Sequence, residues 1–189
     1  KAADKCAKLY NIKSKKVNDL LRDDEIEVIL NLTIPQSHYN VSKKVLTAGK
    51  HVYSEKPLAT YFEKGKELVT LAKKNKLYIG NAPDTFLGGG IQKARELIDS
   101  DLIGNIKLGN AIFAFPGVES FHPKPESWYR KEGGPVIDME PYFFTTLVNL
   151  LGPAKQVQGR TLTAFKKRIY GVGPKKNKSF KVNTPTTYL

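Results

Sequence analysis

The chain has 189 residues, of which 40% are hydrophobic and 26% are charged, so it can build one domain or parts of two around an apolar core. Its single cysteine, Cys6, excludes an internal disulfide framework and any cysteine-cluster metal site. No apolar run approaches the roughly 20 residues that a membrane-spanning helix needs, so we expect no membrane-spanning segment.

The formal net charge is +13, and most of this excess lies near the end of the sequence. Residues 155–189 contain cations and no acid, which leaves two interpretations open. The segment is either a solvated stretch that faces acidic groups outside this chain, or a site for a polyanion. No helix-turn-helix, zinc-finger or RNA-recognition pattern accompanies it, so we do not expect a nucleic-acid partner. The cations are Lys155, Arg160, Lys166, Lys167, Arg168, Lys175, Lys176, Lys178 and Lys181.

The first part of the chain alternates helical and strand patterns. The helix at 60–75 has the clearest pattern: Thr60 and Glu63 are spaced as a capping box, and Leu68, Val69 and Leu71 form an apolar stripe. In chain order we predict helices at 2–10 and 17–22, a strand at 27–32, a helix at 37–48 that ends at Gly49, a strand at 51–54, the helix at 60–75 and a strand at 77–80.

Short apolar strands separated by helices predict parallel pairing with right-handed crossovers, in an α/β fold. Because strands of such sheets are covered on both faces, their continuous apolar runs fit this interpretation. Residues 1–82 therefore resemble the later part of a doubly wound, Rossmann-type sheet. The strand, Gly-rich turn and helix that open a nucleotide-binding sheet are absent, and Gly88-Gly89-Gly90 has neither their spacing nor their place.

The second part of the chain has a different rhythm, which predicts part of an α+β domain over residues 83–189. We expect helices at 90–100 and 142–151, strands at 106–115, 155–165 and 180–189, and a loop at 116–131 that is rich in proline and aromatic residues. The predicted sheet is still open where the sequence ends. An exposed sheet edge is a liability, so we expect further chain or another subunit to complete it.

Glu55-Lys56-Pro57 directly follows the predicted strand at 51–54. Ligands of open α/β sheets bind at the carboxyl ends of the strands, where a lysine can hold a substrate oxygen and stabilise developing negative charge. The alternative is a solvated turn with a proline before the next helix.

A second candidate group is Asp138 with Tyr142, whose i, i+4 spacing places both on one face of a helix near its N-terminus. A carboxylate beside a phenol can handle a proton. The alternative is an Asp138 that only caps the helix, with Pro141 in the first turn and a packed Tyr142.

Together, these segments resemble the Gfo/Idh/MocA family of oxidoreductases, named after glucose–fructose oxidoreductase and inositol dehydrogenase. The resemblance rests on Thr33-Ile34-Pro35 followed by His38, on Gly49-Lys50-His51-Val52 leading into Glu55-Lys56-Pro57, on Gly133-Gly134 with Asp138, and on Leu150-Leu151-Gly152-Pro153. It implies a cytoplasmic, two-domain NAD(P)-dependent dehydrogenase that acts on a sugar or polyol. It also implies a homo-oligomer, a dimer or tetramer, that assembles through the open sheet of the second domain.

The resemblance also implies roles for individual residues. Lys56, Asp138 and Tyr142 would be catalytic and would contact the substrate, with Lys56 polarising the reacting oxygen and Tyr142 exchanging its proton. Thr33, Ile34, Pro35, His38 and Glu55 would bind NAD or NADP together with Lys56. His122 and Trp128 would lie near the substrate. The Lys56–Pro57 bond is expected to be cis, and no metal site is expected because the three histidines lack ligand spacing.

The sequence departs from the family pattern at Glu140, which stands where the motif that starts at Asp138 has a glycine. The missing Gly-rich turn and the unfinished second sheet suggest a central fragment of a longer protein. Two alternatives to a dehydrogenase therefore remain: a relative that uses NAD to open glycosidic bonds, and a non-catalytic binding or assembly subunit.

Overall fold

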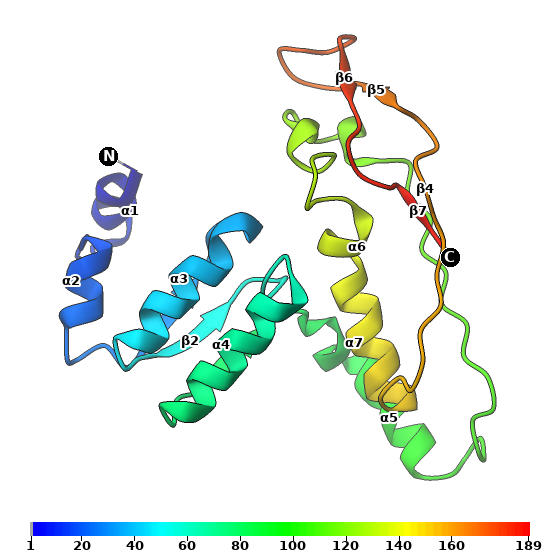
Figure 1. Cartoon of the computed structure of the whole chain (residues 1–189), viewed down its shortest axis with the longest axis horizontal. Helices are drawn as coiled ribbons and strands as arrows, with labels where there is room; N and C mark the ends of the chain where they lie inside the picture. Colours follow the sequence, from blue (N-terminus) through cyan, green and yellow to red (C-terminus); the bar gives the residue numbers. More distant parts are fainter. Residues whose placement is uncertain (1) are drawn as a thin grey trace. The chain divides into compact units, whose positions relative to one another are not determined.

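The computed structural model describes residues 2–189 and divides the chain into two compact units, Lys1–Asn81 and Ala82–Leu189 (Figure 1). The first unit alternates helices and strands as the sequence predicts. Its elements are α1 (Ala2–Tyr10), α2 (Val17–Arg22), β1 (Val28–Asn31), α3 (Pro35–Thr47), β2 (His51–Ser54), α4 (Phe62–Lys74) and β3 (Ile79–Asn81).

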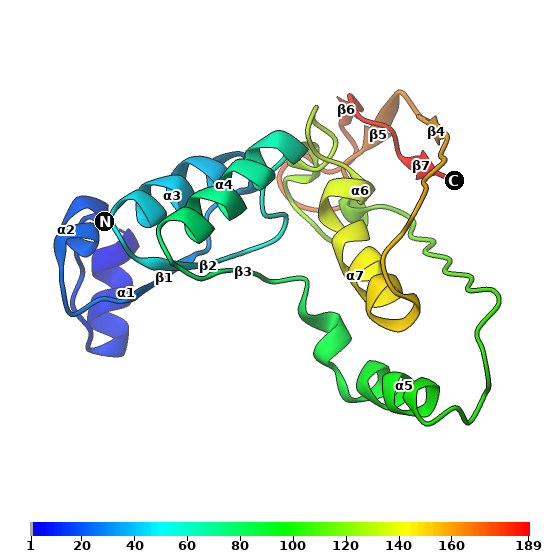
Figure 2. The same cartoon turned by 60° about the horizontal axis from the view of Figure 1, so that its bottom comes forward.

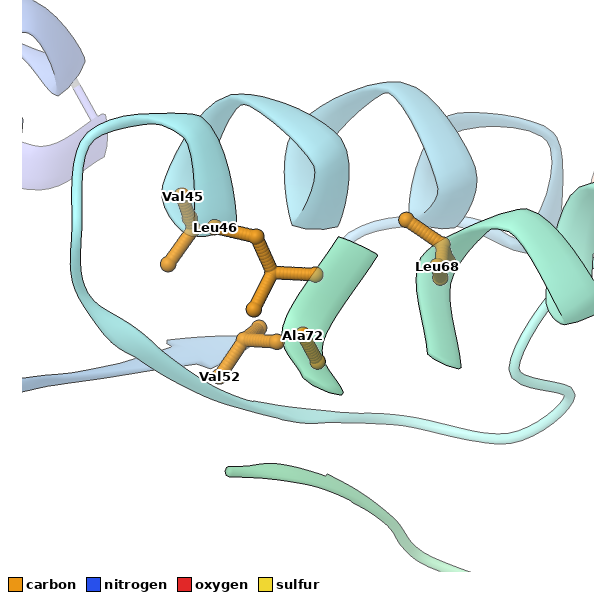
Figure 3. Packing of buried hydrophobic residues seen from close by; sticks show 5 residues of the cluster. All are labelled: Val45, Leu46, Val52, Leu68 and Ala72. Atoms are coloured by element: carbon orange, nitrogen blue, oxygen red, sulfur yellow. The ribbon is translucent and has the colours of Figure 1, made fainter. Parts of the chain in front are cut away.

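The three strands of the first unit form a parallel sheet in the order β1-β2-β3, which confirms the predicted α/β arrangement. Helices α3 and α4 lie side by side over one face of this sheet (Figure 2). Five side chains fill the space between helices and sheet, and each is at most 2% exposed. They are Val45, Leu46, Val52, Leu68 and Ala72 (Figure 3). This contact holds the unit together, because burying an aliphatic side chain contributes about 1.5–3 kcal/mol.

The opposite face of the sheet is apolar and exposed in the described residues. Val28 and Leu30 on β1 are 51% and 63% exposed, and Tyr53, the register partner of Leu30, is 40% exposed. The expectation that both faces are covered is therefore wrong for this sheet within the first unit, since the helices that pack on it, α3 and α4, lie over one face. Gly80 leaves room for the ring of Tyr53, because a Cβ on Gly80 would lie 2.5 Å from that ring.

The predicted capping box at the start of α4 is wrong. Tyr61, in extended conformation, takes the N-cap position, and no side-chain cap hydrogen bond forms there. A capping box requires a serine or threonine at the N-cap and a glutamate three residues later. Because the helix starts one residue later than predicted, Thr60 and Glu63 do not occupy these two positions. Val69 is exposed, and the buried stripe is formed by Leu68 and Ala72. In contrast, Gly49 follows α3 with a φ of +76°, as predicted for a helix stop.

The second unit contains helices and two short antiparallel strand pairs, β4–β7 and β5–β6. A buried cluster connects the loop at 116–131 to the β5–β6 pair. Its members are Val118, Tyr129, Tyr170, Phe180 and Val182, and Trp128 packs against them. The elements are η1 (Asp84–Leu87), α5 (Gly89–Asp99), η2 (Val118–Ser120), η3 (Pro125–Ser127), α6 (Pro135–Asp138), α7 (Glu140–Leu151), β4 (Thr161–Leu162), β5 (Lys167–Ile169), β6 (Ser179–Lys181) and β7 (Thr187–Tyr188).

The strand predictions in this unit are only partly right. Residues 106–115 form no strand, and Leu108 and Ile112 in this segment are 86% and 84% exposed. An alternating pattern becomes a strand only beside a partner, and no described segment pairs with this one. Of residues 155–165 only β4 is a strand, whereas residues 180–189 are divided between β6 and β7 by a stretch that contains Pro185. The charged strand β5 was not predicted.

Candidate active site

The carboxyl ends of the three parallel strands carry polar residues in register. Asn31 ends β1, Ser54 ends β2 and Asn81 ends β3, and the sheet pairs Asn31 with Ser54 and Ser54 with Asn81. Asn31 and Ser54 are buried. Because each side chain has both donors and acceptors or a rotatable hydroxyl, this row can hold the backbone of the loops that leave the sheet.

Asn31 organises the loop between β1 and α3. Its amide nitrogen donates to the His38 carbonyl at 3.1 Å and to Ser42 Oγ at 3.0 Å. Its amide oxygen accepts from Thr33 Oγ1 at 2.7 Å and from the Thr33 N–H at 3.3 Å. Thr33 and Ile34 are exposed, and Pro35 begins α3. The predicted cofactor-binding turn is thus a fixed, accessible loop at the carboxyl edge of the sheet.

The loop after β2 is held at the same edge. The Glu55 N–H donates to the Asn31 carbonyl at 2.9 Å, which continues the β1–β2 pairing by one residue. Asn81 Nδ2 donates to the Ser54 and Glu55 carbonyls at 3.0 and 2.9 Å. Glu55 Oε2 in turn accepts the Lys56 N–H at 2.9 Å. Lys56 is half-buried, and its bond to Pro57 is cis, as predicted.

His38 connects these two loops. The ring is fully buried, with Nδ1 2.7 Å from the Pro57 carbonyl and Nε2 2.7 Å from the Thr33 carbonyl. The ring thus holds the backbone of both loops, and its predicted contact with the cofactor stays a prediction. All the predicted cofactor-site residues therefore lie on the two loops at the carboxyl edge of the sheet or at the start of α3. They are Thr33, Ile34, Pro35, His38, Glu55 and Lys56.

In the second unit, Asp138 and Tyr142 do not share one continuous helix. Asp138 is the last residue of α6 and Tyr142 lies in the first turn of α7, with Met139 between the two helices. The i, i+4 interpretation on a single helix is therefore wrong. So is the alternative of an Asp138 cap, because α7 takes Met139 at its N-cap position and has no side-chain cap hydrogen bond. Both side chains are half-buried.

A cavity of about 330 Å³ opens beside the start of α7. Its walls include aromatic rings and a carboxyl group, from Phe113, Phe115, Trp128, Glu140 and Tyr188. Trp128, predicted to lie near the substrate, is thus part of the cavity wall, whereas His122, Asp138 and Tyr142 are not among its lining residues. Burial raises the pKa of Glu140, so this carboxyl group keeps its proton to a higher pH than a free glutamate does.

Arg168, which lines the cavity, belongs to a mostly buried ion pair. Arg168 on β5 pairs with Glu119 on η2, and Glu119 also accepts a hydrogen bond of 2.6 Å from the Tyr129 hydroxyl. Burial by itself would raise the pKa of Glu119, but the hydrogen bonds from Tyr129 and Arg168 lower it below its usual value. Burial and the Glu119 bond raise the pKa of Tyr129. Sequence patterns did not indicate this group, because its members are far apart along the chain.

Two further features bear on the kind of site. Within residues 2–189, no three His, Cys, Asp or Glu side chains gather in an arrangement that could hold a metal ion. Likewise, none of the helices between residues 2 and 189 combines the length and apolar character needed to cross a membrane.

Comparison with known proteins identifies the chain's family. Residues 1–82 match the family model described as "Oxidoreductase family, NAD-binding Rossmann fold", and residues 91–186 match "GFO/IDH/MocA C-terminal domain". The chain belongs to the Gfo/Idh/MocA oxidoreductase family. A D-xylose dehydrogenase from Paenarthrobacter nicotinovorans is 28% identical over 155 residues, which cover 79% of this chain and 40% of that protein. The family assignment thus confirms the resemblance drawn from the motifs.

Solved structures agree on the fold of this family member. An NAD-binding oxidoreductase from Klebsiella pneumoniae matches 97% of the chain with a TM-score of 0.79 and 20% identity. A levoglucosan dehydrogenase in complex with NADH and levoglucosan matches 92% with a TM-score of 0.75 and 20% identity. The chain spans 49% and 48% of these two structures, so it corresponds to about half the length of such relatives.

Proposed function

We propose that this chain forms part of an NAD(P)-dependent oxidoreductase that transfers hydride between nicotinamide and a secondary alcohol of a sugar or polyol. In this proposal, residues 1–82 are the later part of the dinucleotide-binding domain and residues 83–189 part of the substrate-binding and oligomerisation domain. The protein would act in the cytoplasm as a homo-oligomer. The names of the relatives support a sugar substrate, since they include enzymes of D-xylose and levoglucosan.

The observation that carries the proposal is the ordered carboxyl edge of the first unit. Asn31, Ser54 and Asn81 fix two loops there, and these loops present the exposed residue Thr33 and the half-buried Lys56. This is the edge at which open α/β sheets bind ligands. The residues fit the nicotinamide half of a dinucleotide, which would lie against Thr33, Ile34 and Glu55. Bound nicotinamide would supply hydride chemistry, while the protein supplies placement and charge.

Each catalytic residue has a defined task in this proposal. The Lys56 ammonium polarises the substrate oxygen, and Tyr142, acting as the phenolate, takes the hydroxyl proton and becomes the phenol as hydride leaves the carbon. Asp138 orients Tyr142 and binds a neighbouring hydroxyl group. These roles require Lys56 to meet Asp138 and Tyr142 around one reacting atom, which stays a prediction. The cavity bounded by Trp128 and Glu140 supports a sugar ligand, because an aromatic ring can pack on the apolar face of a sugar and a carboxyl group can hydrogen-bond to its hydroxyl groups.

The test compares cofactor binding and turnover for the chain and two lysine variants. NADH or NADPH binding is followed by the fluorescence of the bound cofactor, and hydride transfer is measured with D-xylose and levoglucosan. Lys56→Ala should lower turnover about 100-fold or more, because loss of one group that stabilises developing charge has an effect of this size. Lys44→Ala, which removes an exposed cation from α3, is the matched control and should retain the parent activity.

Net production of NADH separates this function from the NAD-using glycosidase alternative, in which the cofactor is regenerated. Equal turnover of Lys56→Ala and the parent would contradict the proposal. Cofactor binding without any turnover across the sugar panel would favour the non-catalytic binding subunit.

A further inference from the structure

The three histidines of the chain have different hydrogen-bond partners. His51 Nδ1 accepts the Tyr78 N–H at 3.0 Å, and His122 Nδ1 accepts the Lys124 N–H at 3.1 Å. A nitrogen that accepts a hydrogen bond carries no proton, so the contacts of these two rings require an unprotonated Nδ1. His38 differs, because both of its nitrogens face carbonyl oxygens at 2.7 Å.

A carbonyl oxygen can only accept a hydrogen bond, so it needs an N–H opposite it. A neutral imidazole has one N–H and one lone pair, and it can satisfy only one of the two carbonyls that face His38. The lone pair would then point at an oxygen 2.7 Å away, on a ring that is itself fully buried. Two N–H groups remove that repulsion and make both contacts charge-assisted hydrogen bonds.

We propose that His38 carries protons on both nitrogens and works as a cationic clamp that positions Lys56. The ring joins the loop after β1, through the Thr33 carbonyl, to the loop after β2, through the Pro57 carbonyl. Lys56 directly precedes Pro57, so the clamp fixes the backbone from which the lysine side chain extends. The significance of that position rests on the function proposed above for Lys56.

The surroundings of His38 are mainly uncharged. Asn31 donates to its backbone carbonyl, and the strand ends on either side are Asn31 and Ser54. The titratable groups of the clamped loop are Glu55 and Lys56, and Glu55 accepts the Lys56 N–H. On α3, the neighbouring Tyr39 donates its hydroxyl to Glu67 on α4. The clamp is therefore built from backbone oxygens rather than from a paired carboxylate.

The decisive experiment is NMR on the chain labelled with ¹⁵N at histidine, at about pH 8, where an ordinary histidine with a pKa near 6.5 is mostly neutral. We expect both His38 nitrogens to show directly bonded protons, whereas His51 and His122 show an unprotonated Nδ1. The variants His38→Gln and His51→Gln assign the signals. A His38 ring with one unprotonated nitrogen would overturn the clamp. This readout needs no cofactor, so it is independent of the proposed enzymatic function.

Hydrogen exchange tests what the clamp does to the loop. The Glu55 N–H, bonded to the Asn31 carbonyl, should exchange about tenfold faster in His38→Gln, because at least one buried carbonyl then loses its donor. His51→Gln is the matched control, since that ring holds a different segment, and it should leave this rate within about twofold. Equal rates in the two variants would contradict the positioning role. If His38→Gln does not fold, the spectrum of the parent chain alone decides the proposal.

Discussion

The Glu119–Arg168 pair offers the most direct test of how the second unit is held together. The two side chains are 15% and 18% exposed, so most of their charge is removed from water. Glu119 is also the acceptor for the Tyr129 hydroxyl, and the Arg168 guanidinium lies 5.4 Å from the centre of the Tyr129 ring. Removing the Glu119 charge therefore leaves a mostly buried arginine without its counter-ion.

Glu119→Gln should lower the free energy of unfolding of this unit by about 2–3 kcal/mol. Breaking a fully buried pair costs about 3–5 kcal/mol, and the remaining exposure and the hydrogen bond that glutamine keeps reduce this value. With a urea m-value of about 1–3 kcal/mol/M, the unfolding midpoint should fall by roughly 0.7–3 M. Fluorescence of Trp128, the only tryptophan, measures this transition, because its ring packs against the same cluster.

Lys175→Gln is the matched control, because it breaks the exposed Lys175–Glu126 pair in the same unit. Exposed pairs contribute little, so its urea midpoint should equal that of the parent chain. If Glu119→Gln also leaves the midpoint unchanged, the buried pair does not stabilise the unit and the reasoning is refuted.

The same pair predicts a dependence on pH with a definite sign. The hydrogen bonds to Glu119 lower its pKa in the folded chain, so the stability that they contribute is present above the unfolded value of about 4.3. This contribution is lost as the pH falls through the folded pKa. Parent stability should therefore fall in acid more steeply than that of Glu119→Gln, as measured by urea midpoints across this range. Parallel profiles would contradict the predicted protonation of Glu119.

Two further substitutions test the packing and the backbone. Leu46→Ala should lower the free energy of unfolding of the first unit by about 2–5 kcal/mol, since it opens a cavity under α3, whereas Val69→Ala at an exposed position should change it by less than about 0.5 kcal/mol. Circular dichroism in urea measures both, and equal effects would refute the core assignment. Gly134→Ala should lower the fluorescence midpoint of the second unit, because Gly134 has a φ of +89° and a Cβ would lie 2.9 Å from the Thr184 side chain. Gly89→Ala, where no atom lies within 4 Å of a Cβ, is its control, and equal midpoints for the two alanine variants would contradict the strain argument.

Much of the first unit could be predicted because its signals are local. The strand at 51–54 and the helices at 2–10 and 17–22 have the predicted bounds, and Gly49 ends α3 as expected. Apolar periodicity and helix-stop residues act over a few neighbouring positions, so short windows of sequence contain them. The family motifs were recognisable for the same reason, and they located the loops at the carboxyl edge of the sheet.

The features that the sequence could not supply all depend on contacts between distant segments. The alternating pattern at 106–115 forms no strand because none of the described segments pairs with it, and a break at Met139 puts Asp138 and Tyr142 in two different helices. The alignment of Asn31 with Ser54 and Asn81 depends on strand register. The two carbonyls around His38 come from separate loops that the sheet brings together. Local pattern thus determined which helices and strands of the first unit could form, and tertiary pairing alone decided which polar groups meet.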